Sequence, residues 1–85
     1  MEFVLSQHAK AEIAHRGIPL DVVEKVLGNP AQIVPEHGGM EVFQSRHNFG
    51  DKIFLVRIVV DRKVDPAMVV TVYRTSKIEK YWRKP

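Results

Sequence analysis

The chain has 85 residues, of which 45% are hydrophobic and 27% are charged, a composition typical of one soluble globular domain and too apolar for a disordered segment. It contains no cysteine, which excludes disulfide bridges, a thiolate nucleophile and Cys-ligated zinc, and which agrees with a cytoplasmic location. Residues 1–5 lack the basic and apolar regions of a secretory signal, and no apolar run is long enough to span a bilayer, so we expect no membrane partner.

The formal net charge of +3 is concentrated at the C-terminal end. Residues 71–85 contain five Lys or Arg and one acidic residue, Glu79, whereas residues 1–70 contain eight Lys or Arg and nine Asp or Glu. An excess of cations at one end of a small domain favours a phosphate-rich partner such as nucleic acid. The alternative is a basic tail that only improves solubility.

Two short helices are predicted near the N-terminus, at about residues 7–16 and 19–27. Ser6 provides the N-cap of the first helix, and Gly17 provides the left-handed residue that follows its last turn. Gly28 ends the second helix. The apolar stripe expected to bury the second helix consists of Val22, Val23, Val26 and Leu27.

After Pro30 the pattern changes from helical to extended. Strands are predicted at about residues 31–35, 41–47, 52–60 and 67–74, and a basic tail follows at residues 75–85. Pro35 places the first of these strands at a sheet edge, and the apolar stretch 52–60 is expected at the centre. We therefore expect a single α+β domain, residues 1–85, in which a helical hairpin packs on a three- to four-stranded antiparallel sheet.

Arg57 is an unusual residue in the predicted central strand. Strand alternation places it on an apolar face, together with Ile53, Leu55 and Val59. A cation on such a face needs a partner. The ordinary partners are Glu41, Asp61 or a main-chain carbonyl, and the functional partner is a substrate phosphate, which an arginine holds with two parallel hydrogen bonds.

Other basic and aromatic residues extend this candidate phosphate-binding set. The full set consists of Arg46, Arg57, Arg74, Lys77, Tyr81 and Arg83. Tyr73 and Tyr81 can stack on bases or donate hydrogen bonds, although aromatic side chains near a sheet are more often part of the core. Trp82 is expected to pack against the domain.

His8 lies in the first turn of the first predicted helix and is a candidate acid or base. The alternative is a partly exposed side chain that packs over Phe3. His8, Glu12 and His15 share one helical face, but their spacing is not a known zinc-ligand signature, and a solvated polar face explains it. We therefore expect no metal ligands and no cofactor.

Several segments together resemble a family of small bacterial proteins of unassigned function that is related to the RelE/ParE/BrnT toxin superfamily. The segments are Ser6-x-His8-Ala9, Arg16-Gly17-Ile18, Val22 to Pro30 with its Val26-Leu27-x-Asn29-Pro30 end, Val70 to Lys77, and Lys80-Tyr81-Trp82. The first two are the more specific, and the resemblance spans nearly the whole chain. Pro19 departs from the family pattern, which has a small polar cap at this place.

The resemblance implies a RelE-like fold and a role as the toxin of a bacterial toxin–antitoxin pair. Such a toxin would be a metal-independent endoribonuclease that acts on free or ribosome-bound RNA, and its protein partner would be a cognate antitoxin. The reaction would be internal attack by a ribose 2′-hydroxyl, with a base, an acid and cations that stabilise the phosphate transition state.

Candidate roles follow from the resemblance and from the residue types. The catalytic candidates are His8, Arg46, Tyr73 and Arg74. The substrate-binding candidates are Arg16, Arg57, Lys77, Tyr81 and Arg83. His8 would act as the base or the acid. The residues that would stabilise charge are Arg46, Arg74 and Lys77, and either Tyr73 or Tyr81 would position a base of the RNA.

The alternative function is a non-catalytic domain that binds nucleic acid or an acidic protein through its basic C-terminal edge. Binding of that kind would be salt-sensitive and would involve no turnover. The two functions differ in geometry, because the catalytic one requires His8, Arg46 and Arg74 to lie within side-chain reach of one another.

Overall fold

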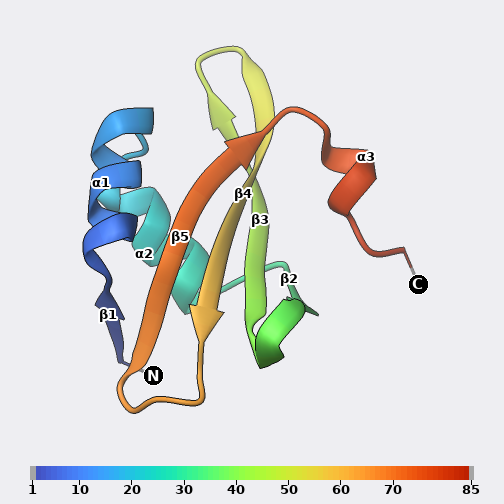
Figure 1. Ribbon diagram of the computed structural model, residues 1–85. Coiled ribbons are helices and arrows are strands. Elements are labelled where there is room, and N and C mark those ends of the chain that lie inside the picture. Colours follow the sequence, from blue (N-terminus) through green and yellow to red (C-terminus); the bar gives the residue numbers. More distant parts are fainter. Residues whose placement is uncertain (1, 85) are drawn as a thin grey trace.

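Five strands form one sheet in the order β1-β5-β4-β3-β2 (Figure 1). The structure is a computed structural model that describes residues 2–84, so the last residue of the predicted tail lies outside the described residues. The elements are β1 (Phe3–Leu5), α1 (Gln7–Arg16), α2 (Leu20–Gly28), β2 (Gln32–Pro35), a 3₁₀ turn η1 (His37–Gly39), β3 (Glu41–Phe49), β4 (Lys52–Asp61), β5 (Ala67–Thr75) and α3 (Ile78–Tyr81). The fold is therefore α+β, as the element pattern predicted.

The sheet is mixed, and the prediction of three or four antiparallel strands was wrong in this respect. β1 is a fifth strand that runs parallel to β5, with Phe3 opposite Ala67 and Leu5 opposite Val69. The remaining neighbours are antiparallel. A three-residue strand is too short to show alternation in the sequence, and it forms here because β5 supplies its partner groups.

The two N-terminal helices begin and end at identifiable capping residues. The Ser6 hydroxyl accepts a hydrogen bond from the Ala9 amide at 3.0 Å, and Gly17 adopts φ 64° at the end of α1. Pro19 was predicted as the first residue of the second helix, but it is the extended N-cap residue, and α2 runs from Leu20 to Gly28. The Pro19 carbonyl still accepts from the Val22 and Val23 amides, so the helix start shifts by only one residue.

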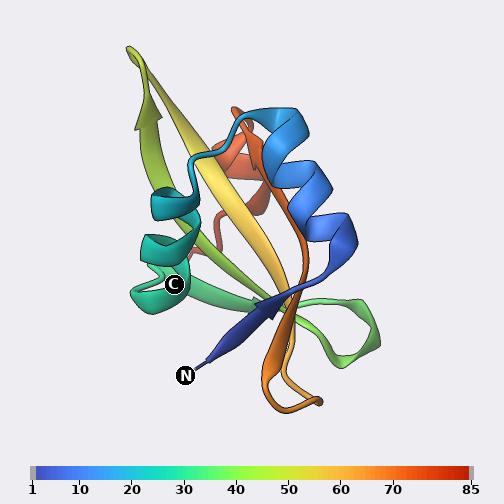
Figure 2. The same ribbon diagram turned by 90° about the vertical axis from the view of Figure 1, so that its left-hand side faces the viewer.

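Both helices cover the same face of the sheet, and α3 lies on the other side (Figure 2). The predicted stripe of α2 is confirmed, since Val22, Val23, Val26 and Leu27 are all buried. They pack with sheet residues that include Phe43, Val56, Ile58 and Val72. The opposite face, called the far face below, holds a smaller apolar cluster of Val34, Val42 and Val59.

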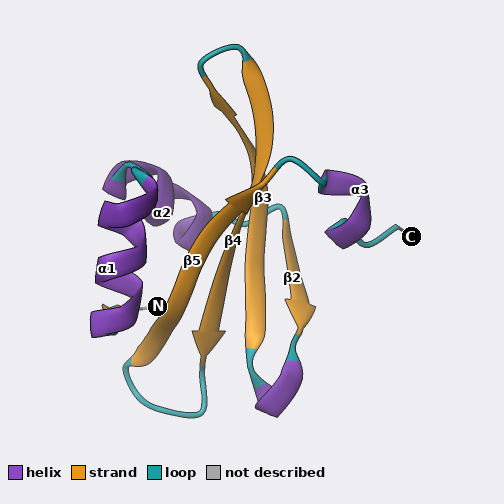
Figure 3. Ribbon diagram, turned by 45° about the horizontal axis from the view of Figure 1, so that its top comes forward, coloured by secondary structure: helices purple, strands orange, loops and turns teal. Residues whose placement is uncertain are grey.

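The hairpin of β3 and β4 is longer than predicted and extends beyond the end of β5. Pairing continues to Phe49 and Lys52 around a turn in which Gly50 has φ 68°, whereas β5 pairs with β4 only as far as Leu55 opposite Thr75. Figure 3 shows this hairpin projecting past β5, with α3 on the side opposite α1 and α2. Within residues 2–84, none of the helices has the length and apolar content needed to cross a membrane.

Candidate nucleic-acid interface

Arg57 lies at the middle of the far face, between two polar side chains from neighbouring strands. The register places Gln44 of β3, Arg57 of β4 and Tyr73 of β5 side by side. Directly opposed residues of adjacent strands point to the same face. The helix-covered face carries the neighbours Val56, Ile58 and Val72, so the three polar side chains belong to the far face.

The Arg57 side chain is nearly buried, and its hydrogen bonds go to uncharged groups. Only 7% of the residue is exposed. Its Nε donates to Gln44 Oε1 at 2.8 Å, and its Nη1 donates to the Tyr73 hydroxyl. The Tyr81 ring lies over the guanidinium, 4.2 Å from ring centre to Cζ. We call Gln44, Arg57, Tyr73 and Tyr81 the Arg57 cluster.

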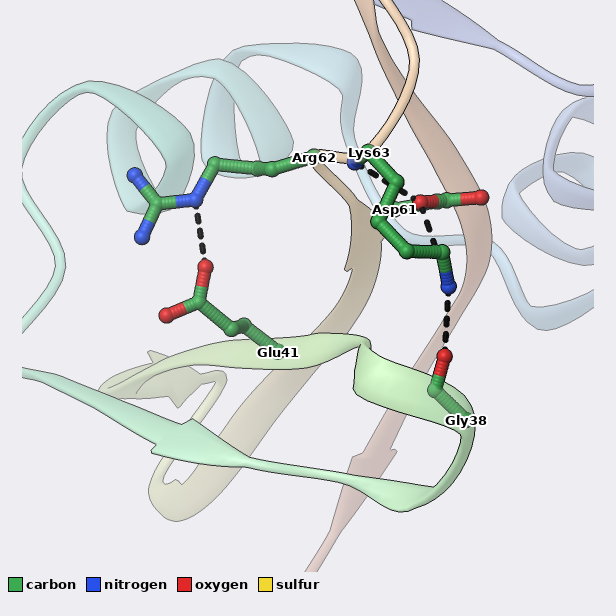
Figure 4. A network of polar contacts seen from close by, with 5 residues as sticks. All are labelled: Gly38, Glu41, Asp61, Arg62 and Lys63. Carbon is green, nitrogen blue, oxygen red and sulfur yellow. Dashed lines mark hydrogen bonds and ion pairs between the residues drawn. The ribbon is translucent and has the colours of Figure 1, made fainter.

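The carboxylates that the sequence offers as partners of Arg57 are used elsewhere. Glu41 accepts from Arg62 Nε, and Asp61 lies 3.7 Å from Lys63 Nζ (Figure 4). The hydrogen bond from Arg62 lowers the pKa of the Glu41 carboxyl. No carboxylate among residues 2–84 forms an ion pair with Arg57. Its positive charge is therefore left without a charged partner in the described chain.

The C-terminal segment is docked on the far face by hydrogen bonds rather than projecting as a free tail. Gln44 Nε2 donates to Gln32 Oε1 at 2.8 Å and to the Tyr81 carbonyl at 3.2 Å. Gln32 Nε2 donates to the Arg83 carbonyl at 2.6 Å and its Oε1 accepts from the Arg83 amide at 3.1 Å. The Arg83 side chain and Lys77 stay exposed.

Arg46 adds a second cation to the same face. It lies opposite Leu55, which lies opposite Thr75, so it shares the far face with Arg57. Its guanidinium lies 4.0 Å from the centre of the Trp82 ring. The expectation that Trp82 packs against the domain is thus met by a contact with an arginine, and this pair of an exposed arginine and a partly buried ring borders the Arg57 cluster.

Arg74 points to the opposite, helix-covered side of the sheet. It lies opposite Val56, and its guanidinium carbon is 4.4 Å from the Phe49 ring centre and 5.0 Å from that of Phe54. A hollow of about 420 Å³ opens here and is lined by His15, Arg16, Phe54 and Arg74. We call this the Arg74 hollow.

His8 is exposed in the first turn of α1, and it lies far from both Arg46 and Arg74. The amide of Ser6, two residues earlier, donates a hydrogen bond to the carbonyl of Val69 near the start of β5. Arg74 lies five residues further along that strand, about 16 Å at the usual rise per residue. Arg46 is on the other face. The structure therefore does not assemble His8, Arg46 and Arg74 into one centre.

The exposed side of α1 carries an ion pair. Glu12 accepts from Arg16 Nε, and this hydrogen bond is the main reason that the pKa of the Glu12 carboxyl is lowered. Within residues 2–84 there is no group of three or more His, Cys, Asp or Glu side chains placed to hold a metal ion.

Sequence reasoning missed Gln32 and Gln44, which organise the far face. Gln44 is fully buried in a strand whose other inward residues are apolar, and a lone glutamine in such a strand is a weak signal of a buried polar contact. Its pairing with Arg57 depends on the register of β3 against β4, which the sequence does not specify.

Comparison with known families gives one match. Residues 5–74 match the model of a family described as a domain of unknown function, DUF4258. The matched range includes Gln44, Arg57 and Tyr73, and it ends before α3. Searches of curated proteins and of solved structures found no match.

Proposed function

We propose that this chain, which belongs to the DUF4258 family of domains of unknown function, binds RNA at the Arg57 cluster and cleaves it without a metal ion. In this proposal Arg57 and Tyr73 replace the expected catalytic set of His8, Arg46 and Arg74, which does not come together in the fold. We further propose that it is the toxin of a bacterial toxin–antitoxin pair, with a RelE-like fold and a cognate antitoxin as its protein partner. The resemblance of the sequence to the RelE/ParE/BrnT superfamily supports the toxin role. The observation that carries RNA binding is a nearly buried arginine without a carboxylate partner among residues 2–84.

A phosphate is the ligand that best completes the Arg57 cluster. A charge removed from water is costly unless an opposite charge compensates it. Gln44 and Tyr73 supply only neutral hydrogen-bond partners, and they hold the planar guanidinium in one orientation. Arginine binds phosphate oxygens with two parallel hydrogen bonds, so a fixed guanidinium also provides geometric selectivity.

The surrounding residues fit a single-stranded nucleic acid. Arg46 provides a second positive charge on the same face, and Tyr81 and Trp82 provide rings. Bases of single strands stack on aromatic side chains, and cations follow the phosphate backbone. The far face therefore combines the two kinds of group that single-stranded RNA requires.

The proposed reaction is attack of a ribose 2′-hydroxyl oxygen on the adjacent phosphorus. The new P–O2′ bond forms as the P–O5′ bond breaks, which yields a 2′,3′-cyclic phosphate and a free 5′-hydroxyl. The 2′-hydroxyl proton passes to water, and the leaving 5′-oxygen takes a proton from the Tyr73 hydroxyl. Arg57 stabilises the negative charge on the phosphate oxygens in the transition state.

Growth and RNA integrity on induced expression in a bacterial host test this proposal. We expect the wild-type chain to arrest growth and degrade RNA, and Arg57→Gln to do neither. Arg62→Gln is the matched control, because Arg62 pairs with Glu41 outside the Arg57 cluster, and it should behave as wild type. Unchanged growth and intact RNA with the folded wild-type protein would rule out the toxin role.

A non-catalytic RNA-binding domain is the second candidate. The specific observation in its favour is that His8 belongs to α1, on the helix-covered side of the sheet, whereas the Arg57 cluster lies on the far face and contains no histidine. This candidate predicts salt-dependent RNA binding without turnover. Binding would then be unchanged in His8→Ala.

A further inference from the structure

We infer that the Arg74 hollow is a second binding site, whose ligand is a nucleotide: a phosphate group joined to a planar base. The hollow lies on the side of the sheet opposite the Arg57 cluster. Tyr73 and Arg74 are consecutive in β5, and their partners Arg57 and Val56 are consecutive in β4, so their side chains point to opposite faces. The inference does not depend on the RNA cleavage proposed above.

The lining of the hollow is basic, and one of its charges is uncompensated. His15, Arg16 and Arg74 line it together with Phe54, and no acidic residue does. Glu12 pairs with Arg16. Arg74 forms no ion pair with any carboxylate within residues 2–84. An anion in the hollow would therefore be attracted by a net positive lining.

Arg74 is oriented by the rings beneath it. Its guanidinium carbon lies 4.4 Å and 5.0 Å from the ring centres of Phe49 and Phe54. Stacking on rings uses the face of a guanidinium and leaves its N–H edge available for a phosphate. Lys52 Nζ also lies 5.4 Å from the Phe54 ring centre, which adds positive charge beside the hollow.

The size of the hollow and its aromatic wall indicate a ligand larger than a bare ion. Its volume of about 420 Å³ falls within the range of small-molecule sites. Phe54 is a partly buried member of the lining and offers apolar surface to a base, while the arginines offer donors to a phosphate. A nucleotide carries both groups in one molecule, either as a free nucleotide or as one unit of an RNA strand.

Titration of the full chain with four probes tests the site. The probes are adenosine monophosphate, adenosine, inorganic phosphate and a short single-stranded RNA, and the readout is amide chemical shifts by NMR together with the dissociation constant. We expect saturable binding of the monophosphate with shifts at His15 and Phe54, and binding weaker by about tenfold for adenosine and in Arg74→Gln, because each loses charge-assisted hydrogen bonds. Phe54→Leu should weaken the monophosphate more than inorganic phosphate.

The controls separate the sources of the ligand and keep the test decisive. Lys63→Gln removes a cation on the loop after β4 and should leave binding unchanged; Arg16→Gln replaces Arg74→Gln if the latter does not fold. Arg74-dependent binding of the monophosphate identifies a free nucleotide, and Arg74-dependent binding of the RNA alone identifies a strand. Binding of neither the monophosphate nor the RNA, or binding by Arg74→Gln and Arg16→Gln as tight as by the wild-type chain, would overturn the site. These outcomes do not depend on whether RNA is cleaved.

Discussion

The Arg57 guanidinium carbon lies 4.2 Å from the centre of the Tyr81 ring, although the two residues belong to a central strand and to the short C-terminal helix α3. Hydrogen bonds hold this contact in place, because the Gln44 side-chain amide donates to the main-chain carbonyl of Tyr81 and to Gln32 Oε1. The C-terminal segment that carries Tyr81 and Arg83 is thus part of the far face. The Arg57 cluster requires both the sheet and the docked segment.

Tyr73→Phe and Tyr81→Phe form a matched pair that tests the proton donor. Tyr73→Phe removes the hydroxyl that accepts from Arg57, so we expect a loss of about 1 kcal/mol in the free energy of unfolding. If Tyr73 is the acid, RNA cleavage should also fall by about a hundredfold. Tyr81→Phe keeps its ring over Arg57, so its free energy of unfolding and its cleavage rate should both stay near those of wild type. Equal cleavage rates for the two variants would exclude Tyr73 as the acid.

Gln32→Ala tests the docking of the C-terminal segment. The substitution removes the acceptor of the Arg83 amide and the donor to the Arg83 carbonyl. We expect amide hydrogen exchange at Arg83 to accelerate by about tenfold, because a hydrogen bond that protects it is lost. Ile33→Ala is the control, since Ile33 is 43% exposed and adjacent in β2. Unchanged exchange at Arg83 would mean that other contacts hold the segment.

Arg62→Gln tests the ion pair between Arg62, which follows β4, and Glu41, at the start of β3. The hydrogen bond from Arg62 holds the pKa of Glu41 below its ordinary value of 4.5. A depressed carboxyl pKa stabilises the fold above that value, and the stabilisation is lost as the pH falls below it. We expect Arg62→Gln to raise the Glu41 pKa, measured by NMR titration, and to reduce the decline in stability on acidification. Lys63→Gln, which affects Asp61, should leave the Glu41 pKa unchanged.

Phe3→Ala tests the contribution of β1, the strand that the sequence did not predict. Phe3 packs edge-to-face on Phe43, with ring centres 5.8 Å apart, and lies opposite Ala67 in β5. Removal of a partly buried ring at this place should cost about 2 kcal/mol in the free energy of unfolding, less than the full burial value. Val4→Ala, at a residue that is 44% exposed, should cost under about 0.5 kcal/mol. Similar values for the two variants in chemical denaturation would show that β1 adds little to the fold.

Local signals predicted α1, α2 and most of the strands because capping and alternation are encoded within a few residues. Ser6 and Gly17 mark the ends of α1, and Pro35 does lie on an edge strand. β1 was missed because its partner groups lie in β5, more than sixty residues away. Contacts of that separation are set by tertiary packing, which no local pattern contains.

The candidate site was predicted by residue type and not by arrangement. The chain does bring Arg57, Tyr73 and Tyr81 together. It separates Arg46 from Arg74, because the face to which a strand residue points depends on register, and a shift by one residue reverses it. His8 was chosen for its chemistry, and nothing in its sequence neighbourhood specified which end of β5 it would approach.

Cleavage of a single-stranded RNA by the purified chain in the presence of EDTA is the most direct test of the Arg57 cluster. The proposal predicts fragments that end in a 2′,3′-cyclic phosphate and begin with a 5′-hydroxyl, and no cleavage where the attacking 2′-hydroxyl is replaced by hydrogen. Arg57→Lys, with folding verified by thermal unfolding, should be slower by about a hundredfold, because a lysine cannot reproduce the paired hydrogen bonds of a guanidinium. No cleavage by the wild-type chain, or equal rates for wild type and Arg57→Lys, would contradict it.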